Sequence, residues 1–169
     1  MLAGHSDSVL RRGKELVNQH WLIELDYRAD IVVVGVEADA AGHGWPQIGS
    51  ALATARNLVA KDGRIVVLSE LDVPPGKGMQ MLMKYDDPAE GLRPLRKAAP
   101  EDLIPATELA EAALWADVYL LSLLESELVD DLFMVPVESE AEARRLLGRE
   151  AQVLFLSSAQ HTFGRIRDH

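Results

Sequence analysis

The sequence contains no cysteine, and only 5% of its residues are aromatic. Without cysteine the chain has no disulfide, no thiolate metal site and no cysteine nucleophile, which fits a reducing cytoplasm. No apolar run approaches the roughly 20 residues that a membrane span needs. Residues 1–20 carry charges throughout, unlike a signal peptide. We therefore expect a cytoplasmic protein without a membrane partner, whose interior is filled by aliphatic side chains.

Basic charge is also scarce. The net charge of −10 argues against a nucleic-acid partner, because phosphates require clustered Lys and Arg. From Glu101 to Ala143 there are twelve Asp or Glu residues and neither Lys nor Arg. Such a run is typical of solvated helix faces, and the alternative is a docking face for a basic partner.

The 169 residues, 48% of them hydrophobic, suit a single domain that spans residues 1–169. Four aliphatic runs predict strands, and helical patterns separate them; the strands are at 30–36, 64–69, 117–122 and 153–157. Strands that are apolar at every position are covered on both faces, as in parallel sheets flanked by helices. The predicted fold is α/β, a three-layer α/β/α sandwich with a mostly parallel, Rossmann-like sheet.

The hydrophobic periodicity also predicts the connecting elements. Helices are expected at 6–20, 46–60, 79–84, 89–98, 108–115, 125–132 and 140–148, and a short strand at 134–137. Gly63 is expected in the left-handed position after the second of these helices, and Thr107 is expected to cap the helix at 108–115. Residues 72–105 form a long loop around two of the helices, and a polar tail follows the last strand.

The candidate ligand site lies where the strand at 30–36 passes through the loop 37–46 into the next helix. Parallel α/β sheets place ligands beyond the carboxyl ends of their strands, and a helix start offers free N–H groups. The residues that we expect to contact a ligand are therefore His43, Gly44, Trp45, Gln47 and Ser50. In the alternative interpretation, Gln47 and Ser50 cap the helix start, His43 is an exposed polar residue of the loop, and Trp45 fastens the helix to the sheet.

Motifs that would identify a reaction are not found. Gly42-His43-Gly44 has Gln47 where a dinucleotide fingerprint needs its third glycine. The five histidines lack metal-binding spacing, and no serine occupies a G-x-S-x-G elbow. We therefore predict no catalytic residue and no metal ligand in this chain.

Several segments in order nevertheless resemble the C-terminal domain of the nickel-dependent lactate racemase family. They are Arg11-Arg12-Gly13-Lys14-Glu15-Leu16-Val17, Ala29-Asp30-Ile31-Val32-Val33-Val34, Gln47-x-x-Ser50-Ala51-Leu52-x-x-Ala55, Asp62-Gly63-Arg64-Ile65-Val66-Val67-Leu68, Ala116-Asp117-Val118-Tyr119-Leu120-Leu121-Ser122 and the run from Glu127 to Val137. The resemblance covers nearly the whole chain apart from residues 72–105.

The resemblance implies a substrate-side domain that is inactive by itself. In that family an N-terminal domain carries the nickel-pincer nucleotide cofactor and the histidines that move the proton, and none of its motifs occurs here. The C-terminal domain contributes a glutamine, matched by Gln47, and a lysine, replaced here by Ser50. Losing that ammonium removes a charge-assisted bond of about 1.5–3 kcal/mol to a substrate carboxylate. The expected substrate is thus a small hydroxy acid or a polyol-like compound.

Two other functions remain open from the sequence. One is a free-standing nucleotide- or anion-binding Rossmann-like module. The other is a non-catalytic interaction domain with an acidic docking face. A reading frame of more than about 400 residues, as two domains of ordinary size require, would favour the racemase-like hypothesis.

Overall fold

The central feature of the computed structural model is a parallel sheet. The structure describes residues 5–38, 40, 42–148 and 151–167, so Asp39 and Ala41 of the predicted ligand loop lie outside the described residues. The sheet has the strand order β5-β4-β3-β2-β6, and every neighbouring pair is parallel. Its strands are β2 (Ala29–Gly35), β3 (Val59–Leu68), β4 (Asp117–Leu121), β5 (Val135–Val137) and β6 (Val153–Leu156). The predicted parallel α/β architecture is confirmed.

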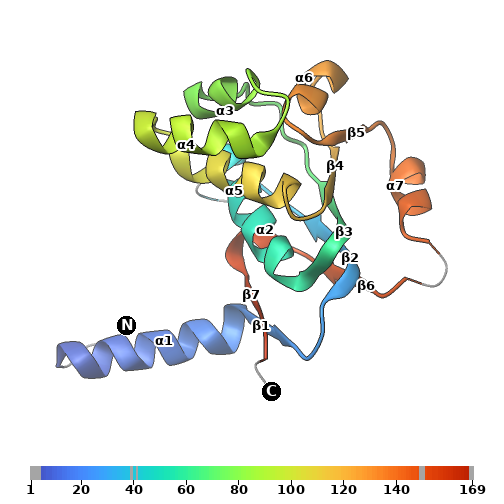
Figure 1. The fold of residues 1–169 in the computed structure, drawn as a ribbon. Coiled ribbons are helices and arrows are strands. Elements are labelled where there is room, and N and C mark those ends of the chain that lie inside the picture. The colour runs from blue at the N-terminus through green and yellow to red at the C-terminus, as the bar shows by residue number, and fades with distance from the viewer. Residues whose placement is uncertain (1–4, 39, 41, 149–150, 168–169) are drawn as a thin grey trace.

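Helices cover both faces of this sheet, which makes three layers (Figure 1). The thicker layer contains α2 (Trp45–Leu58), α3 (Lys77–Leu82), α4 (Pro88–Ala98) and α5 (Leu103–Ala113). The other face carries α7 (Glu140–Leu146), and α6 (Ser126–Asp131) precedes β5. Within the described residues, no helix has the combination of length and apolar character that would cross a membrane.

Alternation along β2 explains why its sequence is apolar at nearly every position. Val32 and Val34 are fully buried in the larger core, under the thicker helical layer. Ile31 and Val33 belong to a smaller core cluster on the other face, where Ala143 of α7 packs. Successive side chains of a strand point to opposite faces, so a strand between two helical layers needs apolar residues at both sets of positions.

The structure contains a second, two-stranded sheet that sequence reasoning missed. The residues after 157 were expected to be a polar tail, but their strand β7 (Phe163–Ile166) pairs in parallel with β1 (Leu22–Leu25). A short 3₁₀ helix, Ala159–His161, precedes β7. Neither four-residue strand has a strong pattern of its own, because the pairing depends on segments from opposite ends of the chain.

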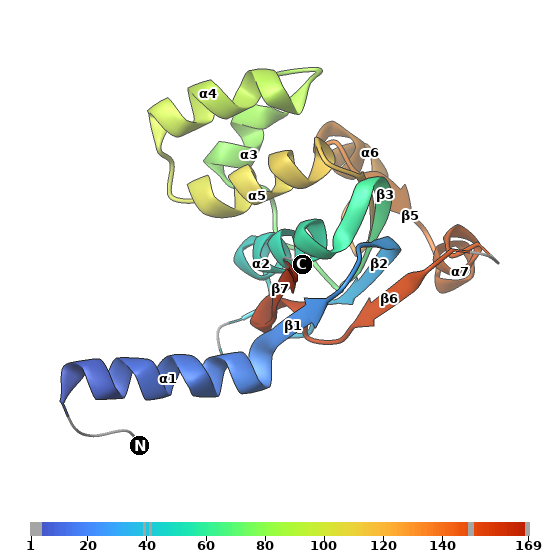
Figure 2. The ribbon, with the colours of Figure 1, turned by 60° about the horizontal axis from the view of Figure 1, so that its bottom comes forward.

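The first helix is present as predicted, but its apolar face is not covered. Helix α1 (Ser6–Trp21) has no buried residue, and Leu10 and Val17 are 74% and 55% exposed. Figures 1 and 2 show α1 extending from the body of the protein, joined to it through β1. The helix therefore makes little contribution to the core.

Two boundaries differ from those predicted. Asp62, rather than Gly63, has the left-handed backbone, with a φ of 60°. Gly63 is needed for a close approach instead, because a Cβ there would lie 2.7 Å from the carbonyl oxygen of Asp30. Helix α5 begins at Leu103, so Thr107 lies inside it and caps nothing. Ser139 does cap α7, accepting a hydrogen bond from the Glu142 amide, and Gly148 ends that segment with a φ of 62°.

Part of the acidic run is neutralised within the fold. Arg56 of α2 pairs with Glu108 at 3.0 Å and also with Glu111, both on α5, and Arg96 pairs with Glu111 at 3.0 Å. The Asp102 carboxylate accepts hydrogen bonds from the amides of α3. These acidic side chains hold helices together and do not form one free docking face.

The Glu108 carboxyl predicts a specific dependence of stability on pH. Burial raises the pKa of Glu108 above its usual value of 4.5, and the Arg56 guanidinium opposes that shift only in part. A raised pKa in the folded state means that the folded protein binds this proton more tightly than the unfolded chain. The stabilisation is present below pH 4.5 and is lost as the pH rises through the raised pKa. We expect Glu108→Gln to weaken the fall in stability over that range in urea unfolding.

The control is Glu127→Gln, at an exposed glutamate on α6. It should reproduce the profile of the unmodified protein. A Glu108→Gln variant whose stability falls more steeply with rising pH would contradict the assignment.

Candidate functional site

A crevice opens at the carboxyl edge of the central sheet, next to the ends of β2, β3 and β4. Its volume is about 640 Å³. Its polar lining comes from the segments after β2 and β3 and from the start of α7: Glu37, His43, Ser69, Glu70, Asp72 and Glu140. This is where parallel α/β sheets bind ligands, because the strand ends and their loops diverge there.

His43 and Ser69 form the one side-chain hydrogen bond between the walls of the crevice that the described residues show. His43 Nε2 and Ser69 Oγ are 2.9 Å apart. Ser69 Oγ also accepts a hydrogen bond from the Leu71 amide at 3.1 Å, which fixes the hydroxyl in place. Among the described atoms, His43 Nδ1 is buried and has no partner. The pair therefore has a nucleophile-and-base arrangement, but no described residue supplies the third group that orients the base in a catalytic triad.

The charge of the crevice is strongly negative. Four of its lining side chains are carboxylates, and the described part of its lining includes neither Lys nor Arg. Among the described residues, no three His, Asp or Glu side chains lie close enough together to hold a metal ion. The carboxylates are therefore spread along the walls, where each accepts hydrogen bonds and none can donate one when ionised.

The start of α2 is organised by its own side chains. Gln47 Oε1 accepts a hydrogen bond from the Gly44 amide at 3.1 Å, which satisfies one of the free N–H groups at the helix start. Trp45 is buried, and its Nε1 donates to the carbonyl oxygens of Val73 and Pro74 at 2.9 and 3.1 Å. The indole thus ties the helix to the loop after β3, and contact of Trp45 with a ligand stays a prediction.

The predicted site residues fall into two groups. His43 lines the crevice, whereas Gly44, Trp45 and Gln47 lie beside it at the helix start and Ser50 is exposed on α2. Contact of these five residues with a substrate stays a prediction. The sequence reasoning missed Ser69 and the carboxylates. Ser69 and Glu70 follow β3, so they would have been found by expecting ligand contacts beyond the carboxyl end of β3 as well as of β2. Glu140 comes from a distant helix that no local pattern connects to the crevice.

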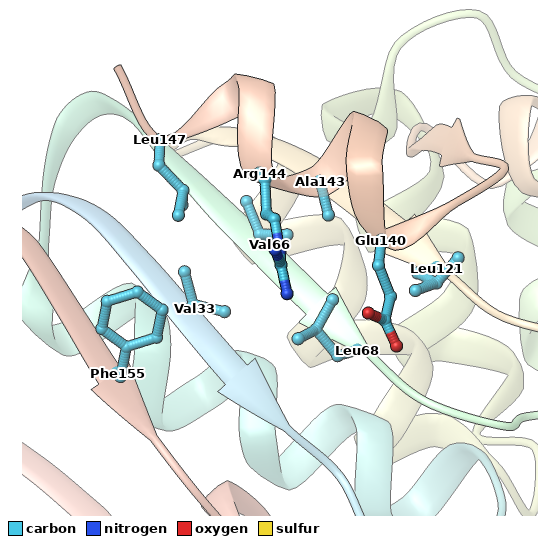
Figure 3. A pocket seen from close by; sticks show the side chains of 9 residues that line it. All are labelled: Val33, Val66, Leu68, Leu121, Glu140, Ala143, Arg144, Leu147 and Phe155. Carbon is cyan, nitrogen blue, oxygen red and sulfur yellow. The ribbon is translucent and has the colours of Figure 1, made fainter. Parts of the chain in front are cut away.

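A smaller, apolar pocket adjoins the crevice beneath α7, on the less covered face of the sheet. Its volume is about 270 Å³. Figure 3 shows its floor of strand side chains, with Phe155 at one side and Arg144 reaching down from α7. Leu68, Leu121 and Glu140 line both the pocket and the crevice, so the two hollows are adjacent.

Comparison with known proteins finds a likeness in three-dimensional structure. No family model matches the chain, and no curated protein matches it. The lactate racemase apoprotein from Thermoanaerobacterium thermosaccharolyticum superposes with a TM-score of 0.80 at 19% identity, over 98% of this chain and 42% of that one. A protein from Thermotoga maritima superposes with a TM-score of 0.66 at 10% identity, over 95% of this chain and 42% of that one.

These superpositions show a shared fold. Over 98% of its length the chain has the fold of part of that lactate racemase apoprotein. The chain spans less than half the length of either solved structure. The match includes α1 and the small sheet, because it covers nearly the whole chain.

Proposed function

We propose that this chain is the substrate-side domain of a lactate racemase-like isomerase, a racemase or epimerase whose catalytic groups lie in another domain. The observation that carries the proposal is the superposition on 42% of a lactate racemase, which leaves most of that chain without a counterpart here. The crevice supports it, because it offers polar groups at the usual ligand position of a parallel sheet. The partner is an N-terminal catalytic domain, and the substrate is a small hydroxy acid or a polyol-like compound.

The residues at the crevice have separate roles in this proposal. His43 contacts the substrate directly, and Gln47 and Ser50 extend the binding surface along the start of α2. Gln47 also holds the Gly44 amide, so it keeps the loop that carries His43 in place. The nickel-pincer nucleotide that the family resemblance implies is assigned in this proposal to the other domain. No step of the proposal runs through nickel.

The alternative of a nucleotide- or anion-binding module has less support. A phosphate or carboxylate ligand would face four carboxylates in the crevice without a lining Lys or Arg to balance them. Like charges brought together in this way oppose binding. The amide of Gly44, which an anion could use at the helix start, is already bonded to Gln47.

The proposal predicts that racemisation needs more than this chain. The 169-residue chain should not interconvert the enantiomers of hydroxy acids or diols, because proton exchange at carbon needs a positioned acid–base pair. The full-length protein that contains it should do so, and Gln47→Ala in that protein should lower turnover or affinity. Chiral chromatography measures the rate of racemisation by the isolated chain and by the full-length protein. Asn57→Ala, at the other end of α2, is the control for Gln47→Ala.

Two outcomes would overturn the proposal. One is racemisation by the isolated chain at the rate of the full-length protein. The other is a natural protein that consists of these residues alone and purifies without a second polypeptide.

A further inference from the structure

We infer that the crevice and the adjoining apolar pocket together bind a hydroxyl-bearing ligand that has an aromatic or alkyl body and no carboxylate. The inference rests on the proposed function for the identity of the crevice as the substrate site, and it narrows the substrate class. The ligand's hydroxyl groups lie in the crevice and its apolar body lies under α7. Leu68, Leu121 and Glu140 line both hollows, so the two lie side by side, and in this inference one small molecule spans both.

The chemistry of the crevice selects the head group. Carboxylates only accept hydrogen bonds, so Glu37, Glu70 and Glu140 require a ligand that donates. A hydroxyl group donates to a carboxylate in a charge-assisted bond, which is among the stronger hydrogen bonds in proteins. A ligand carboxylate offers only acceptors and adds a like charge. The Ser69 and His43 pair supplies the complementary hydrogen-bonding groups for a hydroxyl that both donates and accepts.

The apolar pocket selects the body of the ligand. Its floor consists of side chains from adjacent strands, among them Val33 and Val66, which are nearly fully buried. Phe155 stands at its edge and is 64% exposed, so a ligand ring placed there would cover apolar surface that is now in water.

Arg144 lies on the opposite side of this pocket and reaches toward the sheet (Figure 3). Among the described residues, its guanidinium has no hydrogen-bond or ion-pair partner within contact distance. A guanidinium in this position can stack on an aromatic ring. The same cation could instead hold a carboxylate, but four carboxylates in the adjoining crevice outnumber it.

Four small probes separate these possibilities by varying the head and the body independently. They are 1-phenyl-1,2-ethanediol, mandelate, 1,2-propanediol and lactate. Binding to the full 169-residue chain is measured by NMR chemical-shift titration, which detects weak complexes and does not depend on activity. We expect the phenyl diol to bind at least about tenfold more tightly than mandelate, because the acid meets like charge. We also expect it to bind at least about tenfold more tightly than propanediol, because the ring is buried.

Matched variants test the two halves of the site. In the double variant Glu37→Gln/Glu70→Gln, the affinity for mandelate should come within about threefold of the affinity for the phenyl diol, because like charge is removed. The control, Glu90→Gln/Glu101→Gln, changes two exposed glutamates outside the crevice and should preserve the preference.

The apolar half has its own matched pair. Phe155→Ala should lower the affinity for the phenyl diol about fivefold and leave the affinity for propanediol unchanged, because it removes the ring contact alone. Phe163→Ala, at a similarly exposed phenylalanine on β7, should change neither.

The results distinguish this inference from the proposed function. Mandelate binding as tightly as the diol, or binding of none of the probes, would overturn the inference. Loss of mandelate binding in Arg144→Gln, together with no effect of the glutamate substitutions, would show that the site holds carboxylates and would also overturn it. A third outcome would overturn the proposed function alone. In that outcome the 169-residue chain prefers the diol as expected, but the full-length protein has no racemase activity.

Discussion

Replacing Leu52 with alanine is expected to lower the free energy of unfolding by about 2–5 kcal/mol. Leu52 lies in the middle of α2 and is fully buried in the larger core. Truncation removes apolar contacts and leaves a cavity, because helices α2 and α5 and the sheet surround the site and can close it only partly. Urea unfolding followed by circular dichroism measures the loss, and each kcal/mol should lower Tm by roughly 2–4 °C.

Leu10→Ala is the matched control for this truncation. Leu10 is 74% exposed on α1, which buries none of its residues. The same chemical change should therefore alter stability by no more than about 0.5 kcal/mol. Equal losses in the two variants would mean that α2 does not form the centre of the core in solution.

The second large effect is expected from Gly49→Val. A Cβ at Gly49 would lie 2.7 Å from Pro105 Cα and 2.9 Å from Pro105 Cβ, so a side chain there must push α2 away from α5. The Pro105 Cα belongs to the backbone of α5 and cannot turn aside as a flexible side chain would. We expect a loss of about 1–3 kcal/mol, as for overpacked cores, although removing a helical glycine would by itself be favourable.

Ser50→Val tests whether this loss comes from the helix contact. Ser50 is the next residue in α2 and is exposed, so its substitution introduces the same branched side chain without a clash. Its stability should change by about 0.5 kcal/mol or less. A Gly49→Val variant as stable as Ser50→Val would show that the two helices separate at no cost.

The proposed substrate class follows from one difference between the predicted and observed sites. The sequence directed attention to the helix start, where Gln47 and Ser50 would hold a carboxylate in place of a lysine. In the structure Gln47 is engaged with the Gly44 amide, and the crevice beside it is lined by carboxylates. The polyol-like alternative considered for the substrate therefore has more support from the structure than the hydroxy acid.

The candidate site was predicted only in part. The loop after β2 was identified because a strand, a glycine-bearing loop and a helix follow one another in the sequence, and His43 is indeed on the wall of the crevice. Ser69 was not identified, because its importance comes from its contact with a residue 26 positions away. Glu140 lines the same crevice from α7, which follows β4 and β5 in the sequence.

Local pattern by itself determined the parallel sheet and the core-facing residues of α2. The runs at β2, β3 and β4 are apolar at consecutive positions, which only a strand covered on both faces requires. Ile48, Leu52, Ala55 and Val59 recur at helical spacing and are all buried, although Val59 lies at the start of β3 and not in the helix. These features depend on neighbours within about ten residues, so the sequence expresses them directly.

Only the tertiary structure decided the features that join distant segments. β1 pairs with β7, and Glu24 binds Arg165 across 141 positions, although neither strand is recognisable alone. Helix α5 begins where the Asp102 carboxylate can accept hydrogen bonds from α3, not at the capping threonine that the local pattern favoured. Such contacts are absent from any short window of sequence, because the free energy that selects them comes from groups brought together only when the chain folds.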